Sequence, residues 1–315
     1  MLAPPTDTVE KGIFMRVLIT GGDGRLGRWV GRDLRDNGHE VVSVDRHLPS
    51  TREPGIHFRQ VEMSDLGQII GALAGCDALI HLAAIPSPYA HPDEVVFINN
   101  VGATYNALQA AMTLGIERAI IASSASAYGM AWARPTFPPL YAPLDEDHPF
   151  IVRDPYALSK ETDERTAEMF VRRCGMTVLA YRLHWIAEPG EASRRANDPA
   201  TSPAQDATNL WGYVDVRDAA RAFRLGLEAN LAGFTAFNIV ANDTLRSEPT
   251  EELLRTLLPT TELRRPLPGN ASAWSTTRAR RTSSPTVPAS GSTATSTARR
   301  CTSMCSPRTA RSPTR

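Results

Sequence analysis

Short apolar runs of strand type alternate with segments of helical spacing through most of the chain. The run MRVLIT at 15–20 ends in a glycine cluster, and residues 25–38 then repeat apolar positions at helical intervals. Further strand-type runs follow at 39–45, 56–65, 77–84, 118–126, 176–183 and 234–240, with another helical segment at 216–230. Because fully apolar strands must be covered on both faces, the pattern predicts an α/β fold with a doubly wound parallel sheet.

The pattern divides the chain into four parts. Residues 1–14 precede the first strand and are expected to be a loose extension, 15–183 the large sheet domain, and 184–275 a small substrate lobe interleaved with it. From about residue 276 the pattern stops, and ten Thr, eight Ser and eight Arg occur in forty residues. Such a segment cannot bury a core. Residues 276–315 are therefore expected to be disordered, or to follow a lost reading frame near Arg278.

The formal charge of zero is the sum of unlike parts. The last forty residues hold eight Arg and no acid, whereas the first 275 hold 26 Lys or Arg against 34 Asp or Glu. A basic tail can bind nucleic acid, but this one has no aromatic residues for stacking on bases, and we expect no nucleic-acid partner. No stretch approaches the roughly 20 apolar residues of a membrane span, and the start lacks the apolar run of a signal peptide. We expect a cytoplasmic protein that does not bind membranes.

The four cysteines are too scattered for a disulfide framework, and they do not form a paired Cys-x-x-Cys metal site. We therefore expect no metal.

The stretch TGGDGRLG places Gly21, Gly24 and Gly27 between the first expected strand and the first expected helix. The first glycine permits a tight turn, and the second lets backbone N–H groups approach a pyrophosphate at the positive helix end. The third lets helix and strand pack closely. Glycines also mark plain turns, so this spacing alone leaves both interpretations open.

Asp45 favours the dinucleotide interpretation because it ends the second expected strand, about 20 residues after the turn. A carboxylate there can accept hydrogen bonds from ribose hydroxyls and repel a 2′-phosphate, which favours NAD over NADP. Arg25 and Arg46 are nearby cations that would accommodate NADP instead. For Asp65, at the end of the third expected strand, a contact to adenine and a helix N-cap are equal alternatives.

The stretch DPYALSKE contains Lys160, one of only two lysines in a chain that has 34 Lys plus Arg. Asp154 and Pro155 suit the start of a helix, and residues four apart on a helix share a face, so Tyr156 and Lys160 project the same way. A nearby ammonium stabilises the phenolate that a tyrosine base must form. It can also hold ribose hydroxyls in ways that a rigid guanidinium does not. An exposed tyrosine beside a solvated lysine is the alternative for the spacing alone.

Together the runs TGGDGRLG, HLAA, ASSASAYG and YALSK resemble the extended short-chain dehydrogenase/reductase family, also called the NAD-dependent epimerase/dehydratase family. The resemblance covers residues 15 to about 275. It implies a Rossmann fold, NAD as cofactor, and Ser124, Tyr156 and Lys160 as the catalytic set. The segment FINNVGATYNALQAA is similar to the family's Asn-Val-x-Gly-Thr segment and would put Asn100 near the cofactor. The cofactor residues expected in all are Gly21, Gly24, Arg25, Leu26, Gly27, Asp45, Arg46, Asp65, Leu82, Ala83, Ala84, Asn100, Tyr156 and Lys160.

Departures from the family pattern bear on the substrate, which the resemblance implies to be a sugar or nucleotide-sugar. Members that dehydrate sugars carry Asp-Glu where this chain has Ala125 and Ser126, so dehydration is not expected. The stretch SSASAYG is similar to sugar 4-epimerases, but Trp185 stands where these show an Asn that meets the nucleotide-sugar. The short segment after Arg182 favours a smaller substrate. His184, Trp185 and Ser126 are candidate substrate residues, with ordinary packing as the alternative for the first two.

Three functions therefore stay open at this stage. The first is epimerase/dehydratase-type hydride transfer on a sugar or nucleotide-sugar, and the second is net dehydrogenation of a small sugar or uronate. A binding protein that senses NAD(P) without turnover is the third, and the intact Ser124, Tyr156 and Lys160 argue against it. The resemblance also implies a homodimer, formed through the helical segments near 93–114 and 155–174.

Overall fold

The computed structural model describes residues 14–49, 51–133, 137–274 and 280–282. These described residues belong to one compact unit. The expected loose extension at 1–14 lies outside the described residues except for residue 14. Of the expected tail at 276–315, only residues 280–282 are described, and the rest lies outside the described residues.

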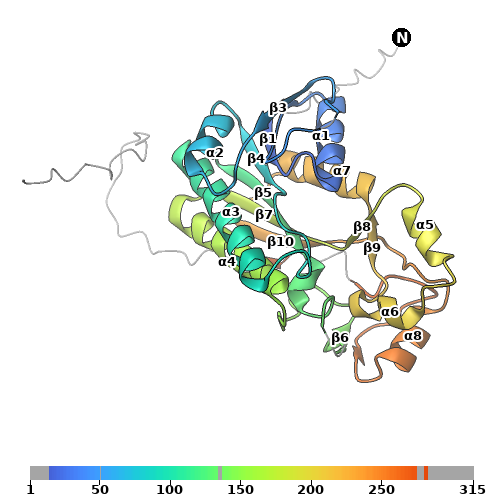
Figure 1. Ribbon diagram of the computed structural model, residues 1–315. Coiled ribbons are helices and arrows are strands. Elements are labelled where there is room, and N and C mark those ends of the chain that lie inside the picture. The colour runs from blue at the N-terminus through green and yellow to red at the C-terminus, as the bar shows by residue number, and fades with distance from the viewer. Residues whose placement is uncertain (1–13, 50, 134–136, 275–279, 283–315) are drawn as a thin grey trace, which may run out of the picture. The chain divides into compact units, whose positions relative to one another are not determined.

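A large twisted sheet forms the centre of the molecule (Figure 1). Its strand order is β3-β2-β1-β4-β5-β7-β10-β12. The strands are β1 (Arg16–Thr20), β2 (Glu40–Asp45), β3 (Ile56–Gln60), β4 (Ala78–His81), β5 (Arg118–Ser124), β7 (Thr177–Leu183), β10 (Phe234–Ile239) and β12 (Arg280–Thr282). The first seven pair in parallel, and β12 pairs antiparallel with β10. The predicted doubly wound, Rossmann-type parallel sheet is confirmed.

Helices cover both faces of this sheet, as its apolar strands require. On one face α1 (Arg25–Asp36) and α7 (Val216–Glu228) pack against each other, and on the other face α2 (Leu66–Leu73), α3 (Asp93–Thr113) and α4 (Pro155–Cys174) form a layer. Each layer has its own buried cluster. Val30, Leu34 and Phe223 belong to the first, and Leu108 and Phe170 to the second.

The chain reverses its direction of travel across the sheet after β3. From β1 it moves outward to β2 and β3, and α2 then returns it to β4, on the other side of β1. The loops after β1 and β4 therefore diverge at the carboxyl edge of the sheet. A crevice at such a switch point is where doubly wound sheets bind ligands.

Short elements extend from this carboxyl edge. They are η1 (Ala125–Tyr128), β6 (Tyr141–Ala142), β8 (Trp185–Ala187), α5 (Glu191–Ala196), α6 (Pro203–Asp206), η2 (Ala207–Asn209), β9 (Tyr213–Asp215), α8 (Thr250–Leu257) and β11 (Glu262–Leu263). They form two small sheets, β6 with β11 and β8 with β9. A separate apolar cluster that includes Trp211, Leu254 and Trp274 holds several of them together. The division into domains at residue 183 stays a prediction.

Two expectations about strands need correction. The third strand ends at Gln60 rather than Asp65, because residues 61–65 lead into α2. Residues 280–282, expected to lack defined structure, form the edge strand β12. Backbone hydrogen bonds to the free edge of β10 require no apolar side chains, so composition did not predict this strand.

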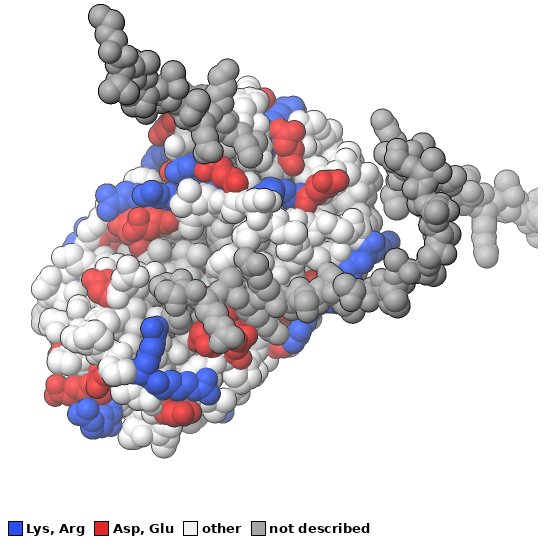
Figure 2. Space-filling model, turned by 180° about the vertical axis from the view of Figure 1, so that it is seen from behind, with Lys and Arg blue, Asp and Glu red and all other residues white. Residues whose placement is uncertain are grey.

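The described surface mixes charges of both signs. On the face shown in Figure 2, Lys and Arg lie interspersed with Asp and Glu among the described residues. Within the same residues, no helix is long and apolar enough to cross a membrane.

Candidate active site

A cavity of about 1170 Å³ lies at the carboxyl edge of the sheet. Its wall is built by the loops and element ends that follow β1, β2, β4, β5 and β7, together with the first turns of α4. Most residues predicted from the sequence line it: Gly21, Gly24, Arg25, Leu26, Gly27, Asp45, Arg46, Leu82, Ala83, Ala84, Ser124, Ser126, Tyr156, Lys160, His184 and Trp185. Residues from distant parts of the chain therefore meet in one place.

The glycine turn has the geometry that a pyrophosphate site needs. Gly21 has a φ of +67°, and a Cβ there would lie 2.8 Å from the backbone nitrogen of Ala83. A Cβ on Gly27 would lie 2.3 Å from the carbonyl oxygen of Gly21. Gly24 caps α1 without a side-chain hydrogen bond, so the first N–H groups of this helix remain available to an anion. The turn fits a dinucleotide.

Asp45 is held at the end of β2 by backbone donors. Its Oδ2 accepts a hydrogen bond from the Asp23 N–H at 3.2 Å, and its Oδ1 accepts one from the Arg46 N–H at 2.8 Å. Arg25 donates to the carbonyl oxygen of Ile186 and to Glu191 Oε2, both at 3.0 Å. The carboxylate thus has a fixed position in the cavity wall, while the Arg25 guanidinium is already paired.

Two of the predicted cofactor residues, Asp65 and Asn100, do not line the cavity. Asp65 is the N-cap of α2, where its Oδ1 accepts from the Gln68 N–H at 3.0 Å. Asn100 is fully buried and braces the loop after β4, with hydrogen bonds to the N–H and carbonyl groups of Ile85 and to Ser159 Oγ. Any direct contact of either residue with a cofactor stays a prediction.

Helix α4 carries the tyrosine and lysine on one face, as predicted. Asp154 caps it by accepting from the Ala157 N–H at 2.8 Å, and Pro155 occupies its first turn. The Lys160 Nζ lies 5.8 Å from the centroid of the Tyr156 ring and donates to the carbonyl oxygen of Ala122 at 2.9 Å. Lys160 is buried, and the solvated lysine that the spacing alone allowed is therefore wrong.

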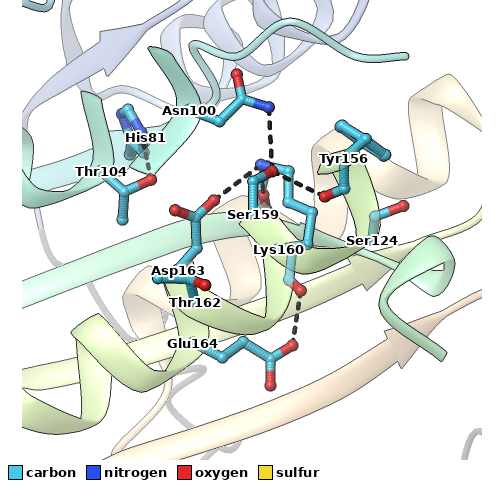
Figure 3. Close-up of polar contacts among 12 residues, drawn as sticks. His81, Asn100, Thr104, Ser124, Tyr156, Ser159, Lys160, Thr162, Asp163 and Glu164 are labelled. Atoms are coloured by element: carbon cyan, nitrogen blue, oxygen red, sulfur yellow. Dashed lines mark hydrogen bonds and ion pairs between the residues drawn. The ribbon is translucent and has the colours of Figure 1, made fainter. Parts of the chain in front are cut away.

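Ser124 lies at the last position of β5, where the strand gives way to η1. Its Oγ accepts from the Ser126 N–H at 3.1 Å, which caps the short helix. Figure 3 shows Ser124 and Tyr156 in the same region, and both line the cavity. A hydroxyl on a strand end and a phenol on a helix start thus line the same cavity.

A buried ion pair that the sequence reasoning missed ties these elements together. Arg182 on β7 donates to both carboxylate oxygens of Glu164 on α4, at 2.9 and 2.8 Å, and Ser123 donates to Glu164 Oε1 at 2.6 Å. The pair fixes α4 against β5 and β7. A charged residue inside the apolar run MTVLAYRL was the available signal, because a buried charge needs a partner.

The segment after β7 lines the remaining part of the cavity. Burial lowers the pKa of His184 to about 3, so the imidazole is neutral. The Arg195 guanidinium lies 5.4 Å from the centroid of the Trp185 ring and is paired with Asp206. Arg246, which is buried, approaches the same carboxylate at 3.1 Å. Arg195 and Asp206 were not predicted, because their pairing depends on the path of α5 and α6.

No group of His, Cys, Asp and Glu that could hold a metal ion occurs among the described residues. The fold and the geometry of the cavity define a dinucleotide-binding α/β enzyme. The model of the NAD dependent epimerase/dehydratase family matches residues 17–239, and the chain belongs to this family. It is an NAD-dependent enzyme.

Individual relatives agree with this assignment. The chain is 27% identical over 245 residues to an L-arabinose 1-dehydrogenase (NAD(P)(+)) of Haloferax volcanii, covering 76% of this chain and 93% of that protein. It is 26% identical over 261 residues to a UDP-glucose 4-epimerase of Lacticaseibacillus casei, covering 71% and 76%. The structure of MoeE5 in complex with UDP-glucuronic acid and NAD shares the fold, with a TM-score of 0.61 at 23% identity, covering 83% and 87% of the chains.

Proposed function

We propose that the protein transfers hydride between NAD and a hydroxyl-bearing carbon of a sugar or nucleotide-sugar. The observation that carries this proposal is the continuity of one cavity. It runs from the glycine turn and Asp45 to Ser124, Tyr156 and Lys160. A dinucleotide seated on the turn would extend toward the tyrosine, which is where a proton must be exchanged.

In this mechanism the Tyr156 oxygen accepts the proton of the substrate hydroxyl while Ser124 donates a hydrogen bond to the same substrate oxygen. Lys160 stabilises the tyrosine oxygen as a phenolate before the transfer. The hydride that leaves the same carbon would be accepted by NAD held at the glycine turn and Asp45. The carbonyl that results keeps the hydrogen bond from Ser124, and the reverse reaction returns the proton from Tyr156.

The wall beyond Ser124 supports a polyhydroxylated substrate. It presents hydroxyl, amide and charged side chains: Ser126, Arg195, Gln205, Asp206, Thr208 and Asn209. The aromatic residues Trp132 and Trp185 also line the cavity. Sites for sugars need many hydrogen-bonding groups, whereas sites for apolar substrates need few.

Net dehydrogenation of a small sugar or uronate is the second candidate. Trp185 lines the cavity, and the Arg195 guanidinium lies over its ring. Asp206 forms an ion pair with that guanidinium, so large side chains are fixed in this part of the cavity wall. A compact sugar suits such a wall better than a bulky nucleotide-sugar. The relative that acts as an L-arabinose 1-dehydrogenase agrees with this candidate, and the UDP-glucose 4-epimerase with the first.

The fate of the hydride distinguishes the two candidates. The purified protein is denatured to release any bound NAD, and native protein with added NAD is then followed near 340 nm, the NADH band, with free sugars, uronates and nucleotide-sugars. An epimerase returns the hydride, so it retains bound NAD and inverts a nucleotide-sugar without NADH accumulation. A dehydrogenase accumulates NADH with a free sugar or uronate. If no substrate of the panel gives either of these two results, the proposed function is contradicted.

A further inference from the structure

Lys160 has a buried acidic neighbour on its own helix, Asp163, which does not line the cavity. The Lys160 Nζ donates to Asp163 Oδ2 at 3.2 Å as well as to the Ala122 carbonyl oxygen (Figure 3). The two side chains are only 4% and 2% exposed. A buried ammonium without an anion tends to lose its proton, because desolvation penalises the charged form. Asp163 supplies that anion.

A chain of hydrogen bonds leads from the end of β1 toward this acid. The Thr20 Oγ1 accepts from the N–H groups of Leu82 and Ala83, at 3.1 and 3.2 Å, which occupies its two lone pairs. Its own proton is therefore donated to His81 Nδ1 at 2.7 Å. The neutral imidazole then carries its proton on Nε2, which donates to Thr104 Oγ1 at 3.2 Å.

In this direction of bonding the Thr104 hydroxyl is an acceptor from His81. Burial lowers the pKa of His81 to about 3, so the ring is neutral as the chain requires. Burial raises the pKa of Asp163, and the charge of Lys160, together with the nearby Thr104 hydroxyl, opposes that rise. Lys160 thus donates to this carboxylate and favours its ionised form, with the Thr104 hydroxyl nearby.

We propose that Asp163 is a positioning residue that keeps Lys160 charged and fixed beside Tyr156 although the ammonium is buried. This rests on the proposed roles of Tyr156 and Lys160. Burial lowers the pKa of Lys160, but the charge of Asp163, followed by that of Tyr156, outweighs it, and the pKa is raised above its ordinary value. Asp163 does not touch substrate, and it acts through the lysine.

Other charged and titratable groups near Lys160 do not replace Asp163. Glu164, on the same helix, is engaged by Arg182. His81 on β4 is neutral. The groups that α3 and β5 bring to the pair are the Thr104 hydroxyl and the Ala122 carbonyl, which carry no charge.

The lysine content of the chain allows a direct test on the protein without cofactor. With [ε-¹³C]lysine the chain gives two side-chain resonances, from Lys11 and Lys160, and a Lys11→Arg variant assigns them. In Asp163→Asn we expect Lys160 to titrate at a clearly lower pH than in the wild type. Glu161→Gln is the control. It removes the acid next to Lys160 in sequence, but about 100° away from Lys160 around the helix, so the titration of Lys160 should be unchanged.

Unchanged titration of Lys160 in Asp163→Asn would overturn the proposal. Should that variant fail to fold, the wild-type titration decides. A Lys160 that titrates above the ordinary lysine value supports the proposal, and one that titrates below that value contradicts it.

The pH profile separates this proposal from the proposed function. In Asp163→Asn, kcat should fall about tenfold relative to the wild type between about pH 7 and pH 9, as Lys160 loses its proton. If Tyr156→Phe is inactive while Asp163→Asn keeps the wild-type profile and titration, only the role of Asp163 is refuted. Full activity of Tyr156→Phe would instead refute the proposed function, whatever Lys160 does.

Discussion

At the residue scale, cofactor choice depends on a carboxylate whose position the backbone sets. The two N–H donors from Asp23 and Arg46 orient Asp45 at the end of β2, in the cavity wall. Arg25 is paired with Glu191 and is therefore less available to a 2′-phosphate. Arg46, which follows Asp45 at the end of β2, is the remaining candidate cation for a 2′-phosphate. From the fixed negative charge of Asp45 we therefore expect a preference for NAD over NADP.

Replacing Asp45 with alanine should weaken that preference. Without the carboxylate the ribose hydroxyls lose an acceptor and a 2′-phosphate is no longer repelled, so the ratio of NADP to NAD affinity should rise about tenfold, or roughly 1.4 kcal/mol. Isothermal titration with both cofactors measures the ratio. Asp36→Ala, at the far end of α1, serves as the charge-matched control. An unchanged ratio in Asp45→Ala would assign cofactor choice to other residues.

At the element scale, the first turn of α1 shows what sequence can predict. Strand, glycine turn and helix are local, so their order predicted the fold, whereas the dinucleotide interpretation of the turn also needed Asp45. The Glu164–Arg182 pair and the Arg195–Asp206 pair could not be derived this way, because their partners lie on separate elements. Composition likewise gave no indication of β12, whose pairing uses backbone groups.

Gly27→Ala tests the packing of that turn. The added Cβ would lie 2.3 Å from the Gly21 carbonyl oxygen and 2.7 Å from the Gly22 Cα, both backbone atoms that cannot move aside. We expect a loss of about 1–3 kcal/mol in the free energy of unfolding and much weaker NAD binding. Denaturant titration and calorimetry measure the two effects.

The matched control is Gly71→Ala in α2, where an added Cβ meets nothing within 4 Å. This change should raise stability by roughly 0.5–1 kcal/mol, because alanine favours the helix. Equal effects of the two substitutions would show that the close approach at Gly27 is unimportant.

At the scale of the whole molecule, α3 and α4 carry several exposed large apolar side chains. Ile98 and Tyr105 on α3 are 67% and 41% exposed, and Leu158 on α4 is 41% exposed. The two helices pack side by side, so these residues belong to one helical layer. We propose that this layer forms the interface of the homodimer expected from the family resemblance.

Ile98→Glu should shift the protein from dimer to monomer, because a charge buried at an apolar interface has no partner. Light scattering coupled to size-exclusion chromatography measures the mass. Leu225→Glu is the control, since Leu225 is also exposed, at 47%, but lies on α7 at the opposite face of the sheet. A wild-type monomer, or a dimer in both variants, would rule out this interface.

Hydride transfer in Tyr156→Phe tests most directly whether this cavity is the active site. The kcat/KM for a substrate of the wild type, and the affinity for NAD, are measured in both the wild type and Tyr156→Phe. We expect a loss of about 10²–10⁴-fold in kcat/KM, because the proton acceptor is gone, with NAD affinity nearly unchanged. Wild-type activity in Tyr156→Phe would contradict the assignment of this cavity as the active site.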